Sequence, residues 1–273
     1  MDHGLLEDLS DKVMQIANIA SDGIMDIYQK HNIYTSNKKD GSDVTEADIL
    51  SNALINEGLE NLKLNIPILS EEDHKKEKQN EEVFWLVDPL DGTKEFLNKN
   101  GEFTVNIALV EKGRPVLGVI TAPALKKAYY GILEKGSFKI ESGVTKPLNA
   151  KKNSGHHARV AISRSHLGVK ENNFIAKISE SFQTVETLKV GSSLKLCMVA
   201  EGEADIYYRS GPTYQWDIAS GQAIVEHSGG CVIDSDLKEL SYSYEAEKKN
   251  PSFFCLGELT EAWKEVIINS STI

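Results

Sequence analysis

Two stretches near the start of the chain carry apolar residues at helical spacing. Over residues 4–29 these positions recur every three or four residues, which is typical of the buried face of an α-helix. A second helix is predicted from Thr45, whose side chain can cap it, to about Leu62. The polar residues 35–43 between them are predicted to form a loop. The apolar positions of the first helix are Leu5, Leu6, Leu9, Val13, Ile16, Ile19, Ala20, Ile24 and Ile27.

The middle of the chain changes to the short apolar runs of β-strands. Residues 71–82 are charged and predict a surface loop, and Lys112-Gly113 predicts a turn between two strands. The runs from Phe103 onward predict an antiparallel sheet in the first half of the protein. The predicted strands are NIPILS (65–70), FWLV (84–87), two strands within FTVNIALVEKGRPVLGVITAP (103–123), KAYYGI (127–132) and GSFKI (136–140).

Strands and helices are predicted to alternate in the second half, which is typical of an α/β arrangement. Because residues 146–157 are polar, we expect a domain boundary there. The prediction is an N-terminal α+β domain over residues 1–150 and a C-terminal α/β domain over residues 151–273. The predicted strands are 158–163, 184–188 and 204–209, and the predicted helices are about 171–181, 192–201 and 217–228.

Composition and charge narrow the classes of partner. The chain has 273 residues, 40% of them hydrophobic, and a formal net charge of -11. Such a surface argues against nucleic-acid polymers, which are bound by neutralising phosphates with Lys and Arg, but bound cations can still attract a small anionic ligand. No apolar run is long enough to span a membrane, and the N-terminus does not resemble a signal peptide. Three widely spaced cysteines indicate reduced thiols and a cytoplasmic location.

Acidic residues stand at the ends of several predicted elements. Acids from separate segments can converge on one cleft, and oxygen ligands without nearby His or Cys suit Mg²⁺ rather than Zn²⁺. Taken singly, an Asp at a helix start is more often a cap or a dipole partner, and a Glu-Glu pair at a loop entry is more often solvated. The acids are Asp48 in the second helix, Glu71 and Glu72 after strand 65–70, Asp88 and Asp91 after strand 84–87, and Asp217 at a helix start.

The segment DPLDGT (88–93) is harder to explain as a structural turn alone. Pro89 stiffens the turn between Asp88 and Asp91, and Gly92 lets backbone N–H groups approach a ligand closely. If Thr93 begins a helix, its amide and hydroxyl add to an anion site. A metal site beside a phosphate site predicts phosphoryl chemistry.

Two longer segments carry a resemblance to a known family. WLVDPLDGT (85–93) and WDIASGQAIVEHSGG (216–230) resemble the two signatures of the inositol monophosphatase superfamily of Mg²⁺-dependent phosphatases. LSEE (69–72) and DVTEAD (43–48) stand where the remaining acidic segments of that family stand. The resemblance covers nearly the whole chain. It implies a layered α-β-α-β-α sandwich of the sugar-phosphatase type.

A finer resemblance is to the 3'(2'),5'-bisphosphate nucleotidase subgroup. It is carried by residues 88–123 and by GSSLKLCMVAEGEADIYYR (191–209). Inositol monophosphatases usually read Thr-Asn-Phe after the Gly-Thr, whereas this chain has Thr93-Lys94-Glu95-Phe96. The resemblance implies hydrolysis of adenosine 3',5'-bisphosphate to AMP and phosphate, with 3'-phosphoadenosine 5'-phosphosulfate as a further substrate, in sulfur assimilation and nucleotide recycling.

The resemblance also implies roles for single residues. Glu71, Asp88 and the backbone carbonyl of Leu90 would hold one Mg²⁺, and Asp88, Asp91 and Asp217 a second, among two or three ions per site. Asp48, Thr93 and Glu71 would be catalytic: Asp48 would hold the Thr93 hydroxyl, which orients the attacking water. The implied substrate-binding residues are Glu71, Leu90, Asp91, Gly92, Thr93, His166, Ser192, Lys195, Arg209 and Asp217.

Substrate choice is expected to depend on the second half of the chain. Ser192, Ser193 and Lys195 open a predicted helix, and Arg209 ends a predicted strand. They could hold the second phosphate or the adenosine of a bisphosphate. Without the resemblance, Lys195 and Arg209 would be interpreted as surface charges, and His166 equally well as an ordinary loop histidine.

Two other functions remain open on the sequence. An inositol or sugar phosphatase could use the same acids, and a protein that only binds a cation or a nucleotide is a third hypothesis. The pairing of Asp48 with Thr93 argues against the third, because binding alone does not need it. We expect a small-molecule partner and either a monomer or a homodimer, and leave open peripheral attachment at the inner face of the cell membrane.

Overall fold

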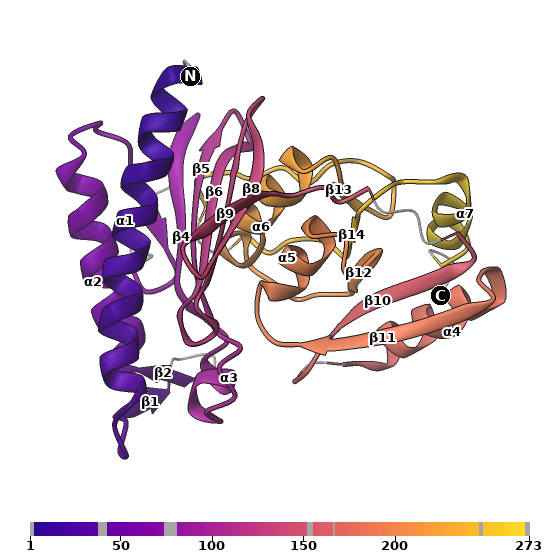
Figure 1. Cartoon of the computed structure of the whole chain (residues 1–273), viewed down its shortest axis with the longest axis horizontal. Coiled ribbons are helices and arrows are strands. Elements are labelled where there is room, and N and C mark those ends of the chain that lie inside the picture. The colour runs from indigo at the N-terminus through magenta and orange to yellow at the C-terminus, as the bar shows by residue number, and fades with distance from the viewer. Residues whose placement is uncertain are drawn as a thin grey trace.

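The computed structural model describes residues 3–37, 43–73, 81–151, 155–165, 167–245 and 248–270. Its elements form five layers: two helices, a seven-stranded sheet, two helices, a five-stranded sheet and two helices (Figure 1). This is the predicted α-β-α-β-α sandwich, so the predicted fold class is confirmed. Among the described residues, no helix combines the length and apolar character needed to cross a membrane.

The outer layer at the N-terminus consists of two long helices, α1 (His3–Tyr28) and α2 (Glu46–Asn61). Both pack on one face of the seven-stranded sheet, where most of the predicted apolar positions of α1 are buried. Leu5 and Ile19 are exceptions, because their side chains are exposed. Thr45 caps α2 as predicted, because its Oγ1 accepts a hydrogen bond from the Ala47 amide at 3.1 Å. The predicted loop over residues 35–43 is wrong at its ends, where β1 (Thr35–Asn37) pairs with β2 (Asp43–Thr45).

The seven-stranded sheet contains the predicted antiparallel strands. Its order is β3-β4-β5-β6-β7-β8-β9, and only β3 and β4 pair in parallel. The turn predicted at Lys112-Gly113 joins β5 to β6, and both residues have positive φ, at 50° and 80°. Such values match the turns that link twisted hairpin strands. The strands are β3 (Ile68–Ser70), β4 (Val83–Asp91), β5 (Thr104–Glu111), β6 (Arg114–Ala122), β7 (Lys127–Ile132), β8 (Gly136–Glu141) and β9 (Val144–Pro147).

Strand β4 runs further than predicted. The sequence placed its end at Val87, but pairing with β5 continues to Asp91 after an irregularity between Asp88 and Asp91. Pro89 lies within this irregularity, where its missing N–H does not interrupt a regular ladder. Asp88 and Asp91 therefore belong to the end of the strand, and the short helix α3 (Thr93–Leu97) follows at once.

The central layer consists of α5 (Leu194–Ala200) and α6 (Gln215–His227), which lie between the two sheets (Figure 1). Helix α6 approaches the first sheet so closely that a Cβ on Gly118 of β6 would lie 2.3 Å from the Ser220 oxygen. An α-helix from the second half thus completes the core of the first half. The division into domains at residues 150 and 151 falls between the two sheets and stays a prediction.

The five-stranded sheet has the order β11-β10-β12-β14-β13. Strand β10 pairs in parallel with β11 and β12, whereas β14 runs antiparallel to its neighbours. The last layer, α4 (Val169–Ser181) and α7 (Glu261–Ser270), covers its outer face. The strands are β10 (His157–Ser163), β11 (Thr184–Val190), β12 (Ile206–Arg209), β13 (Cys231–Asp234) and β14 (Phe253–Leu256), and residues 123–125 form a short 3₁₀ helix in the first half.

Candidate active site

A cavity of about 470 Å³ opens where the end of β4 meets the starts of α3, α5 and α6. Backbone ends from both halves of the chain converge there, which is why residues distant in sequence share it. The predicted site residues that line it are Glu71, Asp91, Gly92, Thr93, Ser192, Ser193, Lys195, Arg209 and Asp217.

Three carboxylates form a compact cluster at this cavity. Glu71, Asp88 and Asp217 each offer an oxygen, and the three oxygens lie within 4.8 Å of one another. Parallel pairing of β3 with β4 brings Glu71 beside Asp88, and the Glu71 amide donates to Val87 O at 3.1 Å. Asp217 comes from the first turn of α6. An all-oxygen set of anions fits a hard divalent cation.

The electrostatics of the acids agree with a cation site. Burial raises the pKa of Asp217 well above its ordinary value, and the charges of Asp91 and Glu71 raise it further. Burial also raises the pKa of Asp91, although Lys195 and a hydrogen bond from Ser193 oppose this. A bound cation would offset the repulsion that these anions exert on one another.

The turn between Asp88 and Asp91 is fixed by two hydrogen bonds. The Leu90 amide donates to Asp88 Oδ1 at 3.1 Å, and Ser51 Oγ of α2 donates to Pro89 O at 2.7 Å. Both contacts hold the Asp88 carboxylate and its flanking backbone in one orientation. The Leu90 carbonyl as a metal ligand stays a prediction.

Asp48 combines a structural contact with a site contact. Its Oδ2 accepts hydrogen bonds from the Thr45 amide at 2.8 Å and the Thr45 hydroxyl at 2.6 Å, which is the capping interaction. Its Oδ1 accepts a long hydrogen bond from Thr93 Oγ1 at 3.4 Å. Asp48 is 2% exposed, so the cap holds its second oxygen beside Thr93.

Gly92 precedes α3 in a left-handed conformation with φ of 91°. A Cβ at this position would lie 3.3 Å from both Glu102 O and Ser192 Cβ. The position therefore favours glycine twice, through its backbone conformation and through the close approach of residues 102 and 192.

The Ser193 hydroxyl contacts three polar groups, and the sequence did not predict any of these contacts. Its Oγ lies 2.7 Å from Asp91 Oδ2 and 2.9 Å from Asp217 O, and it accepts a hydrogen bond from Asn106 Nδ2 at 2.9 Å. Asn106 was missed altogether. The available signal was a fully buried polar residue inside the apolar strand TVNIALV.

Lys195 is not a surface charge, because the whole residue is 6% exposed. Burial lowers its pKa to about 8, although the charges of Asp91 and Glu95 oppose this. Its Nζ donates to Ser192 O and lies 5.3 Å from the ring centre of Tyr207. Arg209, at the end of β12, lines the same cavity, as does Lys94, so three basic residues share it with the acids. His166 lies outside the described residues.

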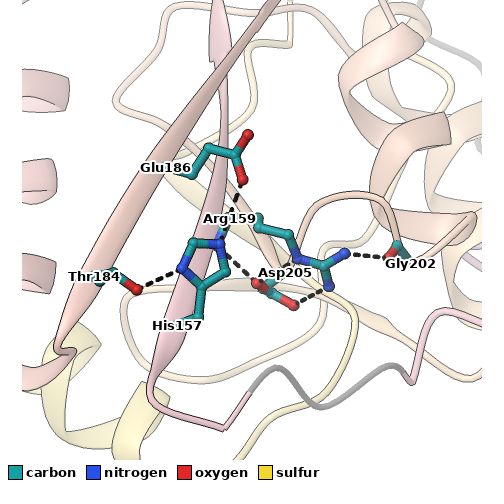
Figure 2. Close-up of polar contacts among 6 residues, drawn as sticks. All are labelled: His157, Arg159, Thr184, Glu186, Gly202 and Asp205. Atoms are coloured by element: carbon teal, nitrogen blue, oxygen red, sulfur yellow. Dashed lines mark hydrogen bonds and ion pairs between the residues drawn. The ribbon is translucent and has the colours of Figure 1, made fainter.

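A second polar cluster lies away from this cavity, where β10 and β11 begin (Figure 2). Arg159 donates to both oxygens of Asp205, at 3.1 and 2.6 Å, and to Gly202 O at 2.8 Å. His157 Nδ1 lies 2.5 Å from Thr184 Oγ1, and its Nε2 lies 3.3 Å from Glu186 Oε2. These contacts link β10 to β11 and to the connection before β12, so we interpret this cluster as structural.

Comparison with known proteins adds three findings. The model of the inositol monophosphatase family matches residues 6–270. The 3'(2'),5'-bisphosphate nucleotidase CysQ of Salmonella typhimurium is 44% identical over 246 residues, which is 89% of this chain and 97% of that protein. A crystal structure of CysQ from Bacteroides thetaiotaomicron has a TM-score of 0.78 at 32% identity, covering 92% of this chain and 98% of that one.

The fold alone extends to more distant proteins. An inositol monophosphatase from Zymomonas mobilis has a TM-score of 0.78 at 23% identity, with 98% of each chain covered.

Proposed function

The chain belongs to the inositol monophosphatase family, and we propose that within this family it hydrolyses adenosine 3',5'-bisphosphate to AMP and phosphate. The observation that carries the proposal is that the carboxylate cluster lies at a cavity lined by Lys195 and Arg209 from the second half of the chain. A bisphosphate needs a metal site for the phosphate that reacts, which the carboxylates could form. It also needs positive charge for the phosphate that does not react, which Lys195 and Arg209 could supply. The likeness to two CysQ proteins over most of the chain supports the same substrate.

Enzymes of this family depend on a metal, and the acid cluster fits one. We propose Mg²⁺, in two or three sites, with Glu71, Asp88 and the Leu90 carbonyl holding one ion and Asp88, Asp91 and Asp217 another. When bound, the ions supply an activated water and neutralise charge on the phosphate and the leaving oxygen.

The residues of the chain itself position the reactants. The Gly92 and Thr93 amides would bind phosphate oxygens, and the Thr93 hydroxyl, held by Asp48, would orient the attacking water and accept or relay its proton. Because Thr45 fixes the Asp48 carboxylate, this pair is ordered before substrate arrives. Attack is by water in line with the leaving oxygen, so no residue becomes phosphorylated.

The second phosphate would lie against Lys195 and Arg209, with Ser192 at the same wall of the cavity. His166 is proposed as a further contact to the substrate. On the same argument, 3'-phosphoadenosine 5'-phosphosulfate should be accepted, because it keeps the phosphate that reacts and an anionic group at the 5' side. These activities would place the enzyme in sulfur assimilation and nucleotide recycling.

A panel of phosphate esters tests the proposal. We expect metal-dependent phosphate release from adenosine 3',5'-bisphosphate, abolished by a chelator, and slower release from inositol 1-phosphate and fructose 1,6-bisphosphate. A preference for inositol 1-phosphate would overturn the substrate, and no release from any ester would overturn the enzyme. Asp91→Asn should lose metal affinity and rate together.

A pair of variants tests the role of Thr93. Thr93→Ala should lower kcat about 10²-fold, because the hydroxyl that orients water is gone. Thr93→Ser keeps that hydroxyl and should stay within about tenfold of the wild type. Calorimetry should show similar metal affinity in all three proteins. An unchanged kcat in Thr93→Ala would show that the role is misassigned.

A further inference from the structure

Glu102 connects the two sides of the cavity. It lies just before β5, whereas its partners follow the ends of β10 and β11. Arg164 Nε donates to Glu102 Oε2 at 2.6 Å and Arg164 Nη2 to Oε1 at 2.7 Å. The Gly191 amide donates to the same carboxylate at 2.7 Å, and Arg164 Nη2 also donates to Lys189 O at 3.1 Å. We call Glu102, Arg164 and Gly191 the clasp.

Close packing accompanies the clasp. A Cβ on Gly191 would lie 2.6 Å from Glu95 Cγ and 2.8 Å from Glu102 O, so only glycine fits between residues 95 and 102. Ser165, next to Arg164, donates to Glu95 Oε1 at 2.5 Å. Four hydrogen bonds thus tie the segment after β4 to the segments that follow β10 and β11.

The clasp stands between the two groups that a bisphosphate would contact. The segment 92–102 starts with the proposed phosphate-binding residues, and Gly191 is followed by Ser192 and Lys195. We propose that Glu102 and Arg164 are positioning residues that set substrate specificity by holding Lys195 at the separation from Gly92 that a bisphosphate spans. This inference rests on the proposed function.

An ordinary ion pair at a surface would not carry such a role, because such pairs contribute little. This one is bidentate, and three N–H groups converge on a carboxylate whose side chain is only 17% exposed. Burial raises the pKa of Glu102, but the hydrogen bonds from Arg164 and Gly191 outweigh it and lower the pKa below its ordinary value. Glu102 is therefore anionic within the clasp.

The protein contains a matched control. Arg114 of β6 also joins the two halves, through Glu226 of α6 and through Glu239, and its side chain is about as exposed as that of Arg164, at 48% against 41%. Arg114 does not line the cavity. Arg114→Ala therefore removes a similar ion pair without touching the clasp.

Steady-state kinetics on two substrates test the inference. In Arg164→Ala and Glu102→Gln, KM for adenosine 3',5'-bisphosphate should rise about tenfold with little change in kcat, because the second phosphate is misplaced. KM for a small monophosphate ester such as p-nitrophenyl phosphate should stay within about twofold. Arg164→Lys, which keeps the charge but not the fork, should be intermediate. Arg114→Ala should leave both substrates unchanged.

Hydrogen exchange of the ligand-free protein gives a second measure. The peptide covering residues 189–196 should exchange faster in Arg164→Ala than in the wild type or in Arg114→Ala. The inference is overturned if the clasp variants keep the wild-type selectivity, if they lose activity equally on both substrates, or if the exchange of residues 189–196 is unchanged. Each of these outcomes leaves the proposed function intact, provided that the wild type hydrolyses the bisphosphate. If the wild type does not hydrolyse the bisphosphate, the proposed function fails and the specificity role fails with it.

Discussion

Ser193 shows how one hydroxyl can order several charged groups. It accepts one hydrogen bond, from Asn106, and its single proton can reach only one of two oxygens, Asp91 Oδ2 or Asp217 O. Donation to Asp91 holds its carboxylate beside the start of α5, where burial raises the pKa of Asp91 and this hydrogen bond opposes the rise. Ser193 therefore supports the geometry of the acids that we propose as metal ligands.

This arrangement predicts the effect of removing the hydroxyl. Ser193→Ala should weaken Mg²⁺ binding about tenfold, in the range of changes to groups that orient metal ligands, and calorimetry measures it. Ser137→Ala is the matched control, because Ser137 is equally buried but donates only to Ile224 O at 2.6 Å. The control should lose about 1 kcal/mol of unfolding free energy and no metal affinity. Equal metal binding in Ser193→Ala would contradict the role.

Lys195 is the residue whose charge should separate the two substrate classes. Lys195→Met keeps most of the buried stem and removes the charge. Loss of a charge-assisted contact of about 1.5–3 kcal/mol should lower kcat/KM for adenosine 3',5'-bisphosphate about 10- to 150-fold. A monophosphate ester should change little. If both substrates fall equally, Lys195 is structural.

The pKa of Lys195 adds a pH dependence. Because burial lowers this pKa to about 8, the side chain is a cation below about pH 8 and loses its charge above it. KM for the bisphosphate should therefore rise as the pH increases through about 8 to 9. Lys195→Arg, which stays charged, should remove that rise. A wild-type KM that is flat across this range would show that the charge is not used.

At the scale of single residues, the sequence predicts which acids gather at the cavity better than it predicts the hydrogen bonds that hold them there. Asp88, Asp91 and Gly92 follow from one short segment, because the two acids and the glycine lie next to each other in it. The links of Asn106 and Glu102 to the cavity could not be predicted, since each depends on a partner more than 60 residues away.

Among the elements, α6 carries an acid-sensitive group at its last residue. Burial lowers the pKa of His227 to about 4, and Arg114 adds to this, so His227 is neutral in the folded state. In the unfolded chain it takes up a proton below about pH 6.5. Its contribution to stability is therefore present above pH 6.5 and lost as the pH falls towards 4.

Urea unfolding at two pH values tests this. Between pH 7 and pH 5 His227 should account for a loss of about 2 kcal/mol in unfolding free energy. Between these two pH values, the free energy of unfolding of His227→Phe should fall by about 2 kcal/mol less than that of the wild type. His31→Gln, which changes an exposed histidine, should behave as the wild type does. A variant with the full wild-type loss would assign the acid sensitivity to other groups.

Elements with a clear period are predicted well, and those fixed by distant partners are not. Helix α1 follows from its apolar spacing because one face packs on the sheet along its whole length. Strands β1 and β2 are three residues each and largely polar, so no alternation marks them. The extension of β4 to Asp91 depends on its pairing with Thr104, which the strand's own sequence does not reveal.

For the whole molecule, the placement of α6 between two sheets was beyond sequence reasoning. Its sequence is apolar and small on most sides, and 10 of its 13 residues are buried. That composition fits a central layer but does not say which two sheets cover it. The approach of α6 to Gly118 shows that the seven-stranded sheet covers one side of the helix, and its contacts with β13 and β14 show that the five-stranded sheet covers the other.

This placement makes the acid cluster a property of the whole fold. Asp88 and Glu71 belong to the first sheet and its edge, whereas Asp217 belongs to the helix that both sheets share. Without a cation, the repulsion among them opposes the packing of α6 on the sheet. A bound cation would join the layers at that point.

Metal binding should therefore stabilise the entire molecule. A ligand that binds only the folded state at a hundred times its Kd adds about 2.7 kcal/mol to the free energy of unfolding, so Mg²⁺ should raise Tm by several degrees. Asp217→Asn removes one of the repelling charges and should raise the Tm of the metal-free protein above that of the wild type. The same variant should gain little Tm from Mg²⁺ and lose activity, because it lacks one of the three carboxylates that would hold the ion. Differential scanning fluorimetry with Mg²⁺ or with a chelator measures all four values. If Asp217→Asn lowers the metal-free Tm and responds to Mg²⁺ as the wild type does, Asp217 is a structural cap of α6 and the cation site excludes it.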